Sequence, residues 1–382
     1  MTLTTSFRIP SIIHYGAGAL GELGSTAQEL GFTRVLLVTD ASMVKLGVAG
    51  QAQALLEKAG IGVTLFDRLQ PDPTLQNVED GLAVLRAGNC DGIVAVGGGS
   101  SIDCAKGISV RHNNPEPLPD FIGVEKIPRA GLGVIAVPTT AGTGSEVTRV
   151  MVITDSGRDV KMMFASRHCL CAAAIADPAL TLSMPRLLTA AVGVDALCHA
   201  IEAYVSKRAQ PMTDLLALSA IRLIAPNLRT ACDDGQNLRA REAVMLGAMQ
   251  AGMAFSNSSV ALVHGMARPL GACFHLTHGL SIAVLLPVVT EFSLPAASER
   301  YARIAAEMGA SEIVSALHQL NLDTGIPSLR ALNVPADRYE SLIGKMSADA
   351  LASGSPANNP RSANAGVRTP RPERRHMPRR AR

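Results

Sequence analysis

Short apolar runs rich in β-branched residues alternate with amphipathic stretches over the first half of the chain. The runs are RVLLVTD at 34–40, IGVTLFD at 61–67, GIVAVGGG at 92–99 and GVIAVP at 133–138. Helices that cross between parallel strands produce this alternation, so residues from about 7 to 180 predict a parallel, helix-covered sheet. The Pro-rich stretch 113–131 is expected to form a surface excursion before the next strand.

Beyond Pro185 the strand-like runs largely cease. Long stretches rich in Ala, Leu and Met, such as 215–228 and 241–255, carry apolar residues at helical spacing. We therefore expect an α/β domain over residues 1–181 and an all-helical domain over 182–361. Residues 362–382 hold seven arginines, no lysine and little apolar bulk, and this composition predicts a disordered tail because like charges repel and nothing drives burial.

Composition narrows the class of protein. A chain of 382 residues has room for two domains, and the lack of a run of about eighteen apolar residues argues against a membrane span. The N-terminus MTLTTSFRIPSII lacks the regions of a cleaved secretion signal, so a cytoplasmic location is expected. The seven cysteines are scattered and odd in number, which predicts reduced thiols.

The charge balance favours small-molecule chemistry. A formal net charge of +3 is nearly neutral for this length, aromatic residues make up 3% and Trp is absent. These features offer neither a basic face nor a stacking platform for nucleic acid. We therefore expect a small-molecule substrate, with no nucleic-acid partner and no membrane partner.

A carboxylate and an imidazole four residues apart, Asp195 and His199, lie in GVDALCHAIEAY. This spacing places the two side chains one above the other on a single helical face, close enough to share an ion. The apolar neighbours Val194, Leu197 and Ile201 indicate that this face points inward. The pair therefore predicts half of a buried metal site.

A later segment, VHGMARPLGACFHLTHG, supplies His264 and His278 among small and apolar residues. Together the four side chains are typical of a site with one carboxylate and three imidazole ligands. Mixed nitrogen and oxygen ligation suits Fe²⁺ or Zn²⁺, and ligand type alone does not separate them. The alternative is that each histidine is an ordinary helix residue with a local hydrogen bond.

The sequence DGIVAVGGGSSIDCAKG reads as an apolar strand, three glycines and the start of a helix. The glycines permit close backbone approach, and Ser100 or Ser101 can cap a helix whose amides point toward an anion. This pattern predicts a pyrophosphate cradle, although a tight turn without a ligand is the alternative. A second loop, VPTTAGTGSEVT, follows another strand and could hold the same ligand.

A further glycine pattern follows the short run SIIHY, where Gly16, Gly18 and Gly21 spell G-x-G-x-x-G. We rank it below the triple-glycine loop because its leading strand is short and is broken by Pro10. Under either interpretation Asp40 ends a strand, where its carboxylate could bind ribose hydroxyls and repel a 2′-phosphate. This favours NAD over NADP, with a plain helix or turn cap as the alternative role of Asp40.

Four motifs together match a known family: GGGSSID at 97–103, PTTAGTGSEVT at 138–148, GVDALCHAIEAY at 193–204 and VHGMARPLG at 263–271. The chain resembles the iron-containing (group III) alcohol dehydrogenases from about residue 7 to 361. The resemblance implies a Rossmann-like nucleotide-binding domain and a C-terminal helical domain, with the active site in the cleft between them, which is a dehydroquinate synthase-like architecture. It also implies NAD, one divalent ion, Fe²⁺ or alternatively Zn²⁺, and a homodimer.

Carried over by motif, the metal ligands would be Asp195, His199, His264 and His278. The resemblance places the cofactor contacts at Asp40, Gly98, Gly99, Ser100, Asp103, Thr139, Thr140, Thr148, Lys161 and Leu180.

One departure from the family pattern bears on proton handling and on the substrate. Family members commonly carry a second histidine four residues after the third ligand, and Arg268 stands there in this chain. If the segment is helical, Arg268 lies one turn beyond His264, where its planar guanidinium could bind an anionic group on the substrate. Alternatively, Arg268 turns outward or pairs with a local acid.

The expected reaction is hydride transfer between NAD(H) and an alcohol or aldehyde, with a divalent ion polarising the substrate oxygen. Water or a ribose hydroxyl can carry the proton where the usual histidine is missing. Two alternatives remain at this point. One is a metal-dependent lyase or cyclase of the related dehydroquinate synthase type, and the other is a catalytically impaired protein that binds NAD and metal.

Overall fold

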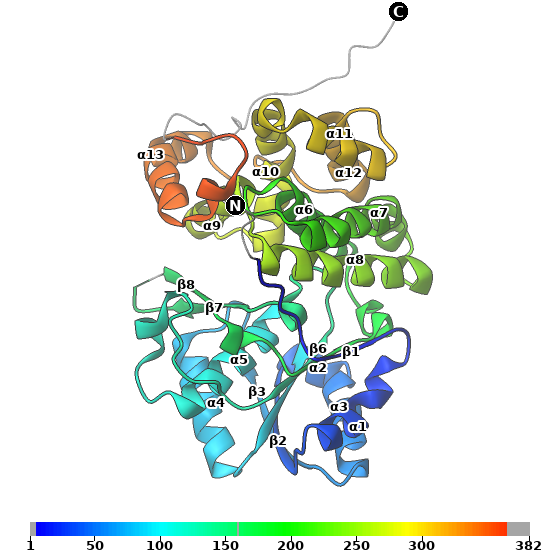
Figure 1. Ribbon diagram of the computed structural model, residues 1–382, viewed down its shortest axis with the longest axis vertical. Coiled ribbons are helices and arrows are strands. Elements are labelled where there is room, and N and C mark those ends of the chain that lie inside the picture. Colours follow the sequence, from blue (N-terminus) through cyan, green and yellow to red (C-terminus); the bar gives the residue numbers. More distant parts are fainter. Residues whose placement is uncertain (1–4, 159, 365–382) are drawn as a thin grey trace, which may run out of the picture.

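The protein consists of an α/β part followed by a helical part, as a computed structural model that describes residues 5–158 and 160–364 shows. In Figure 1 the α/β part occupies the lower half and the helices the upper half. The fold class expected from the alternation of apolar runs is thereby confirmed. Residues 365–382, which make up most of the predicted tail, lie outside the described residues.

A six-stranded sheet forms the centre of the α/β part, and its neighbouring strands pair in parallel. Because β4 lies between β2 and β6, the segments that follow these three strands meet at one edge of the sheet. In spatial order the strands are β1 (Ile12–Tyr15), β9 (Ala173–Ala176), β6 (Val134–Pro138), β4 (Gly92–Gly97), β2 (Arg34–Asp40) and β3 (Gly62–Leu69).

Helices cover both faces of this sheet because buried side chains alternate along each strand. Val35 and Leu37 of β2 join one apolar cluster with α1 (Leu23–Glu29) and α3 (Val48–Lys58). Leu36 and Val38 join another with α4 (Leu75–Ala87) and α5 (Gly99–Asn113). The short helix α2 (Ala41–Lys45) follows β2 directly. The near-continuous apolar strands of the sequence thus become a sheet buried on both faces.

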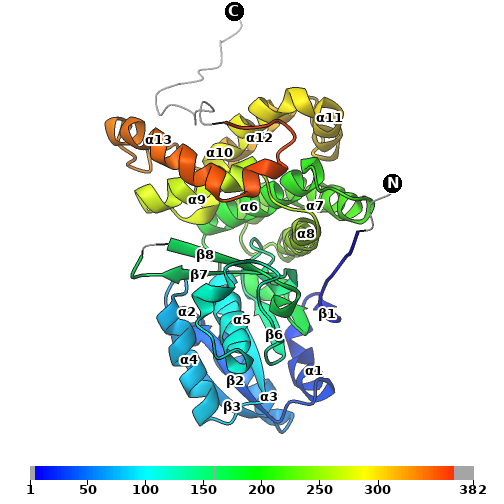
Figure 2. The same ribbon diagram turned by 60° about the vertical axis from the view of Figure 1, so that its left-hand side comes forward.

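A second, three-stranded sheet has the order β5 (Gly123–Val124), β8 (Val160–Ala165), β7 (Val150–Asp155). Its strands β7 and β8 lie between the larger sheet and the helical part (Figure 2). The stretch 113–131, expected as a surface excursion, contains the 3₁₀ helix η2 (Leu118–Phe121) and β5. Part of that stretch therefore belongs to a sheet, because β5 pairs with β8.

The helical part is arranged around α6, which packs against α7, α8 and α10. Its helices are α6 (Arg186–Val205), α7 (Pro211–Asp233), α8 (Leu238–Asn257), α9 (Leu262–Phe274), α10 (His278–Ser293), α11 (Ser298–Glu307), α12 (Ile313–Thr324) and α13 (Ala336–Ala352). The remaining 3₁₀ helices are η1 (Ala19–Glu22), η3 (Ser145–Val147), η4 (Arg167–Cys169), η5 (Pro178–Thr181), η6 (Leu294–Ala296) and η7 (Ser355–Asn358).

Three helices, α6, α7 and the segment His278–Ala296, are long and apolar enough to cross a membrane by length and composition. The expectation drawn from the absence of long apolar runs is corrected to this extent. In the folded protein, 89% of the most apolar window of α6 is buried, against 44% for α7 and 56% for His278–Ala296. The apolar surface of α6 is therefore used in packing against its neighbours.

Candidate metal centre and nucleotide loops

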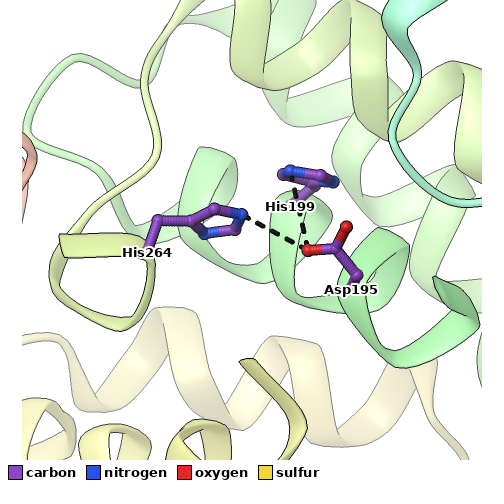
Figure 3. Close-up of side chains that lie close together, drawn as sticks. All are labelled: Asp195, His199 and His264. Atoms are coloured by element: carbon purple, nitrogen blue, oxygen red, sulfur yellow. Dashed lines mark ion pairs between the residues drawn. The ribbon is translucent and has the colours of Figure 1, made fainter. Parts of the chain in front are cut away.

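Three helices of the helical part bring a carboxylate and three imidazoles together. Asp195 and His199 lie on α6, His264 lies on α9, and His278 is the first residue of α10. The Nε2 atoms of the three histidines lie 3.8, 3.5 and 3.7 Å from Oδ1 of Asp195, in chain order. Figure 3 shows His199 and His264 both directed at this oxygen. The structure thus brings together all four side chains that the sequence singled out.

Three of the four side chains are buried, and the fourth, His278, is exposed to solvent. Asp195, His199 and His264 are 2%, 4% and 4% exposed, whereas the His278 side chain is 41% exposed. His199 stacks on Phe255 of α8, with ring centroids 4.2 Å apart. The aromatic ring covers one side of the cluster, so solvent and small molecules reach it most readily beside His278.

Burial and neighbouring charges shift the pKa values of the carboxylate and the imidazoles in different directions. Burial alone would raise the pKa of Asp195, but the nearby His199, His278 and His264 outweigh it and hold that pKa below its ordinary value. Burial lowers the pKa of His199 to about 3, which keeps this imidazole neutral at pH 7. Burial also disfavours the charged form of His264, yet contacts with Asp195 and Glu202 raise its pKa to about 9.

Two buried atoms at the centre of the cluster fit a metal ion. Oδ1 of Asp195 and Nε2 of His264 lack a hydrogen-bond partner, and a buried polar atom left unpaired costs about 1–3 kcal/mol. Ligand atoms about 2.1 Å from a tetrahedral ion lie about 3.4 Å apart, close to the 3.5 Å between these two atoms. A divalent ion at this position would satisfy both, so the residues fit the group that the sequence implies.

Glu202 adds a second carboxylate behind the first ligands. Its Oε2 accepts a hydrogen bond of 2.7 Å from Nδ1 of His264, and Cys198 Sγ lies 3.8 Å from the same nitrogen. Cys198, Glu202 and His264 could by spacing hold an ion of their own. However, burial raises the pKa of the Cys198 thiol well above its usual range, and Glu202 is already bonded to backbone amides. We therefore treat this group as support for His264.

The two predicted phosphate loops lie side by side at the carboxyl ends of adjacent strands. Gly98 precedes α5 as its N-cap, and Gly99 is the first residue of that helix. Thr139 follows β6, and its amide donates a 2.9 Å hydrogen bond to the Gly97 carbonyl. Thr140 is the next residue along this second loop and is partly exposed. This end of the sheet therefore brings the N-terminus of α5 and the threonines of the second loop side by side, an arrangement that suits a pyrophosphate.

Asp40 lies next to this edge, at the end of β2. Its Oδ1 caps α2 by accepting hydrogen bonds from the amides of Ser42 and Met43, at 2.8 and 3.1 Å. Its Oδ2 faces the turn at Gly97, 3.6 Å from where a Cβ on that glycine would lie. Asp40 therefore has the capping role considered as an alternative and still has one oxygen directed at the loop.

Ser100 and Lys161 are connected through one loop residue. The amide of Asp72 donates to Oγ of Ser100 at 3.3 Å, and the carboxylate of Asp72 pairs with Nζ of Lys161 at 2.8 Å. Lys161 lies on β8, which faces the helical part (Figure 2). Leu180 is partly buried in η5 and packs against the core on the α1 and α3 side. Ser100 and Lys161 are thus linked through Asp72, whereas Leu180 lies apart from them.

Asp103 and Thr148 lie beneath the second loop, in a network built around Lys106. Asp103 accepts hydrogen bonds from the Ser145 hydroxyl and from the amide of Val152. Lys106, one turn along α5 and 1% exposed, donates to the carbonyls of Ser145, Thr148 and Val150 at 2.6, 3.0 and 2.8 Å. The helix that begins at the first loop therefore also fixes the position of the second.

The second loop also lies directly against the helices of the helical part. A Cβ on Gly142 would lie 2.6 Å from the Cβ of Val192 in α6, and one on Gly144 would lie 2.7 Å from the Cα of Gly252 in α8. Gly144 has a φ of 63°, in the left-handed region. Glycines are needed here because the loop backbone contacts the helices directly. These contacts place the second loop against α6, the helix that carries Asp195 and His199.

Arg268 lies on α9 and reaches the α/β part. Its Nη2 lies 3.5 Å from Sδ of Met163 in β8, and in the described part of the chain it forms no ion pair with a carboxylate. The pKa of His278 lies below its ordinary value because the group is partly buried and because the positive charges of Arg268 and Lys161 oppose its protonation. Two cationic side chains therefore lie near the exposed ligand of the cluster.

Glu202 and Lys106 are two residues of the site that were not predicted from the sequence. Glu202 lies seven residues after Asp195 on the same face of α6, so helical periodicity could have identified it. Lys106 stands three residues after Asp103 on a buried stretch of α5. A lysine on an inward face is an available signal, but its backbone acceptors come from a loop about forty residues later and carry no sequence signature.

A parallel α/β part with loops suited to a nucleotide, held against a buried cluster of one carboxylate and three imidazoles, defines a metal-dependent oxidoreductase. Two family models match the chain, iron-containing alcohol dehydrogenase over residues 10–178 and its C-terminal domain over residues 189–366. The chain belongs to the iron-containing alcohol dehydrogenase family, as the four sequence motifs predicted. It is an enzyme of alcohol oxidation or aldehyde reduction.

Individual relatives agree with this assignment. The chain is 42% identical over 372 residues to 1,3-propanediol dehydrogenase of Klebsiella pneumoniae, covering 94% of this chain and 95% of the relative. A crystal structure of 1,3-propanediol oxidoreductase superposes with a TM-score of 0.91 at 41% identity, over 95% and 97% of the two chains. Sulfoacetaldehyde reductase from Bifidobacterium kashiwanohense in complex with NAD⁺ gives 0.86 at 28% identity, over 95% and 96%. Nothing among these favours a cyclising lyase or an inactive binding protein.

Proposed function

We propose that the protein interconverts an alcohol and its aldehyde with NAD(H), using Fe²⁺, or alternatively Zn²⁺, held by Asp195, His199, His264 and His278. The observation that carries the proposal is the pair of unpartnered buried atoms, Asp195 Oδ1 and His264 Nε2, within the cluster. When bound, the ion supplies Lewis acidity at the substrate oxygen and the nicotinamide carries the hydride.

The chain's own residues orient the reactants. Asp195 contributes the negative charge that balances a divalent ion, and the His199 ring stacked on Phe255 keeps water from one side of the cluster. Because His278 is the exposed ligand, the substrate approaches beside it, next to β8. The amides at Gly98 and Gly99 and the hydroxyls of Ser100, Thr139 and Thr140 are suited to hold the pyrophosphate on the other side.

The basic test is an assay of NADH oxidation with a panel of aldehydes, combined with elemental analysis. We expect one divalent ion per chain and turnover that is lost on chelation and restored by Fe²⁺ or Zn²⁺. Full turnover by protein that is free of metal would overturn the proposal.

The same assay tests the choice of nucleotide. We expect NADH to be preferred over NADPH, because Oδ2 of Asp40 faces the loop and would repel a 2′-phosphate. Asp40→Gly should gain NADPH-dependent turnover. Asp40→Asn is the matched variant, since it keeps the cap on α2 and removes only the charge. Equal efficiency of NADH and NADPH in the unmodified enzyme would contradict this role of Asp40.

We further propose that the substrate carries an anionic group bound by Arg268, in place of the family's usual histidine. Support comes from the absence of a carboxylate partner for Arg268 within the described chain, and from its position with Lys161 near His278. A relative that reduces sulfoacetaldehyde, an aldehyde bearing a sulfonate, is consistent with this substrate class. The proton then passes to water or to a ribose hydroxyl, since arginine is a poor proton carrier.

The measurement for Arg268 compares kcat/KM for an ω-semialdehyde acid with that for the neutral aldehyde of equal length. A charge-assisted contact of about 1.5–3 kcal/mol should favour the acid by roughly ten- to hundredfold. Arg268→His should lower this ratio, whereas Arg208→His, at an exposed site on the chain, should leave it unchanged. If the parent does not prefer the acid, or if Arg268→His leaves the ratio of the two kcat/KM values unchanged, Arg268 does not determine substrate specificity.

Other features remain part of the proposal. We propose domain bounds of 1–181 and 182–361, a cytoplasmic location, a homodimer, and no membrane or nucleic-acid partner. They are supported by the family assignment and by a nearly balanced charge.

A further inference from the structure

The carboxylate of Glu202 is buried and accepts three hydrogen bonds. The side chain is 2% exposed. Oε1 accepts from the amide of Val263 at 2.6 Å, and Oε2 accepts from the amide of Ala261 at 2.8 Å and from Nδ1 of His264 at 2.7 Å. Ala261 and Val263 are at the N-terminus of α9, so Glu202 on α6 satisfies amides that the helix itself leaves free.

These contacts fix which nitrogen of His264 faces the cluster. Backbone amides can only donate, so they hold Glu202 as an acceptor, and the only group that can complete the bond at Nδ1 is a proton on the imidazole. In the neutral ring that proton leaves the lone pair on Nε2. This atom lies 3.5 Å from Oδ1 of Asp195 and lacks a hydrogen-bond partner.

We propose that Glu202 is a positioning residue for the metal centre. It orients the imidazole of His264, keeps the proton on Nδ1 and thereby presents Nε2 to the ion, while anchoring the start of α9 to α6. The inference rests on the metal site of the proposed function and extends it to a residue that does not touch the ion. A carboxylate behind a ligating histidine commonly strengthens metal affinity by this arrangement.

A purely structural role for Glu202 predicts a different result. If the carboxylate only capped α9, its loss would lower the thermal stability of the metal-free protein, and the folded fraction would bind metal as before. If it positions His264, metal affinity falls even at a temperature where the variant is fully folded.

The informative variant is Glu202→Gln. Its amide has one acceptor oxygen where the carboxylate has two, so its NH₂ group faces either Nδ1, where it favours the proton on Nε2, or the amide of Val263. In both orientations the negative charge that holds the proton on Nδ1 is lost. The matched control is Asp177→Asn. Asp177 is also a buried carboxylate, 3% exposed, that accepts from two backbone amides, those of Leu20 and Ala179 at 3.2 and 3.0 Å. It is the N-cap of η5 and is not a member of the cluster.

The experiment titrates Zn²⁺ into metal-stripped full-length protein against a chromophoric chelator, with circular dichroism as the check on folding. We expect the Kd of Glu202→Gln to rise by about 10- to 100-fold over the parent, and that of Asp177→Asn to stay within about twofold. If the parent itself does not bind Zn²⁺, the metal site of the proposed function fails. If the parent binds and Glu202→Gln binds equally well, or if the Asp177 control loses as much, the inference on Glu202 is overturned.

Should Glu202→Gln fail to fold, Glu202→Asp provides the second test. It keeps the charge and the capping chemistry but is one methylene shorter, so it cannot reach both the α9 amides and Nδ1 without shifting. We expect a smaller rise of Kd, between the parent and tenfold, and a Kd identical to that of the parent would refute the positioning role.

Discussion

Replacing His264 with Ala is expected to abolish metal binding and turnover together. The substitution removes a ligand atom at the centre of the cluster, 3.5 Å from Oδ1 of Asp195. Loss of Lewis acidity at the substrate oxygen removes several kcal/mol of transition-state stabilisation, which corresponds to about a thousandfold or more in kcat. Metal content by mass spectrometry and NADH-dependent turnover are the two measurements.

The fold should survive this change. Glu202 keeps its two backbone donors in the variant, and the space left by the imidazole can admit water. His14→Ala, in the edge strand β1 and not a member of the cluster, is the matched control and should keep both metal and turnover. A full metal complement in purified His264→Ala would contradict the ligand assignment.

Replacing Lys106 with Met is expected to destabilise the α/β part and to weaken NADH binding. The ammonium group donates to the carbonyls of Ser145 and Thr148 in the second loop and of Val150 in β7, and Met removes these three bonds. Removing one partner of a buried charged network costs about 3–5 kcal/mol. At about 2–4 °C per kcal/mol for domains of this size, the Tm should fall by about 6 °C or more.

A change in NADH affinity should accompany the loss of stability, because the second loop would keep the bond from Ser145 to Asp103 but lose its bonds to Lys106. Lys126→Met, at an exposed position, is the control and should leave both quantities unchanged. The measurements are thermal unfolding and the NADH Kd from fluorescence. An unchanged Tm for Lys106→Met would mean that water replaces the ammonium group and that the buried lysine is dispensable.

The features of this molecule that could be predicted from the sequence are those set by residues close together in the chain, such as helical spacing or the order of a strand, a glycine loop and a helix. Asp195 and His199 share a face because four residues make about one helical turn, and the strand-glycine-helix order predicted the loop at Gly98 correctly as a strand end. The pairing of β5 with β8 had no such signal. It depends on a two-residue strand within a Pro-rich segment, and its partner lies about forty residues away.

In the candidate site, too, some residues could be predicted from the sequence and others could not. The four proposed ligands were found because histidines and a carboxylate are rare enough within apolar segments to stand out, with the family motifs to join them. Glu202 stands on the same helical face but was passed over, because its partners Ala261 and Val263 contribute only backbone amides. Any residue type offers such an amide, so the contact leaves no trace in the sequence.

The composition of α6 also bears on the time before the chain has folded. As it leaves the ribosome, this helix is long and apolar enough to resemble a membrane anchor, and the cellular insertion machinery selects segments by hydrophobicity. Asp195 occupies the middle of Arg186–Val205, where an ionised side chain costs about 2.5–3.5 kcal/mol on insertion. The carboxylate that completes the metal cluster therefore also makes the newly synthesised helix a poor candidate for transfer into a lipid bilayer.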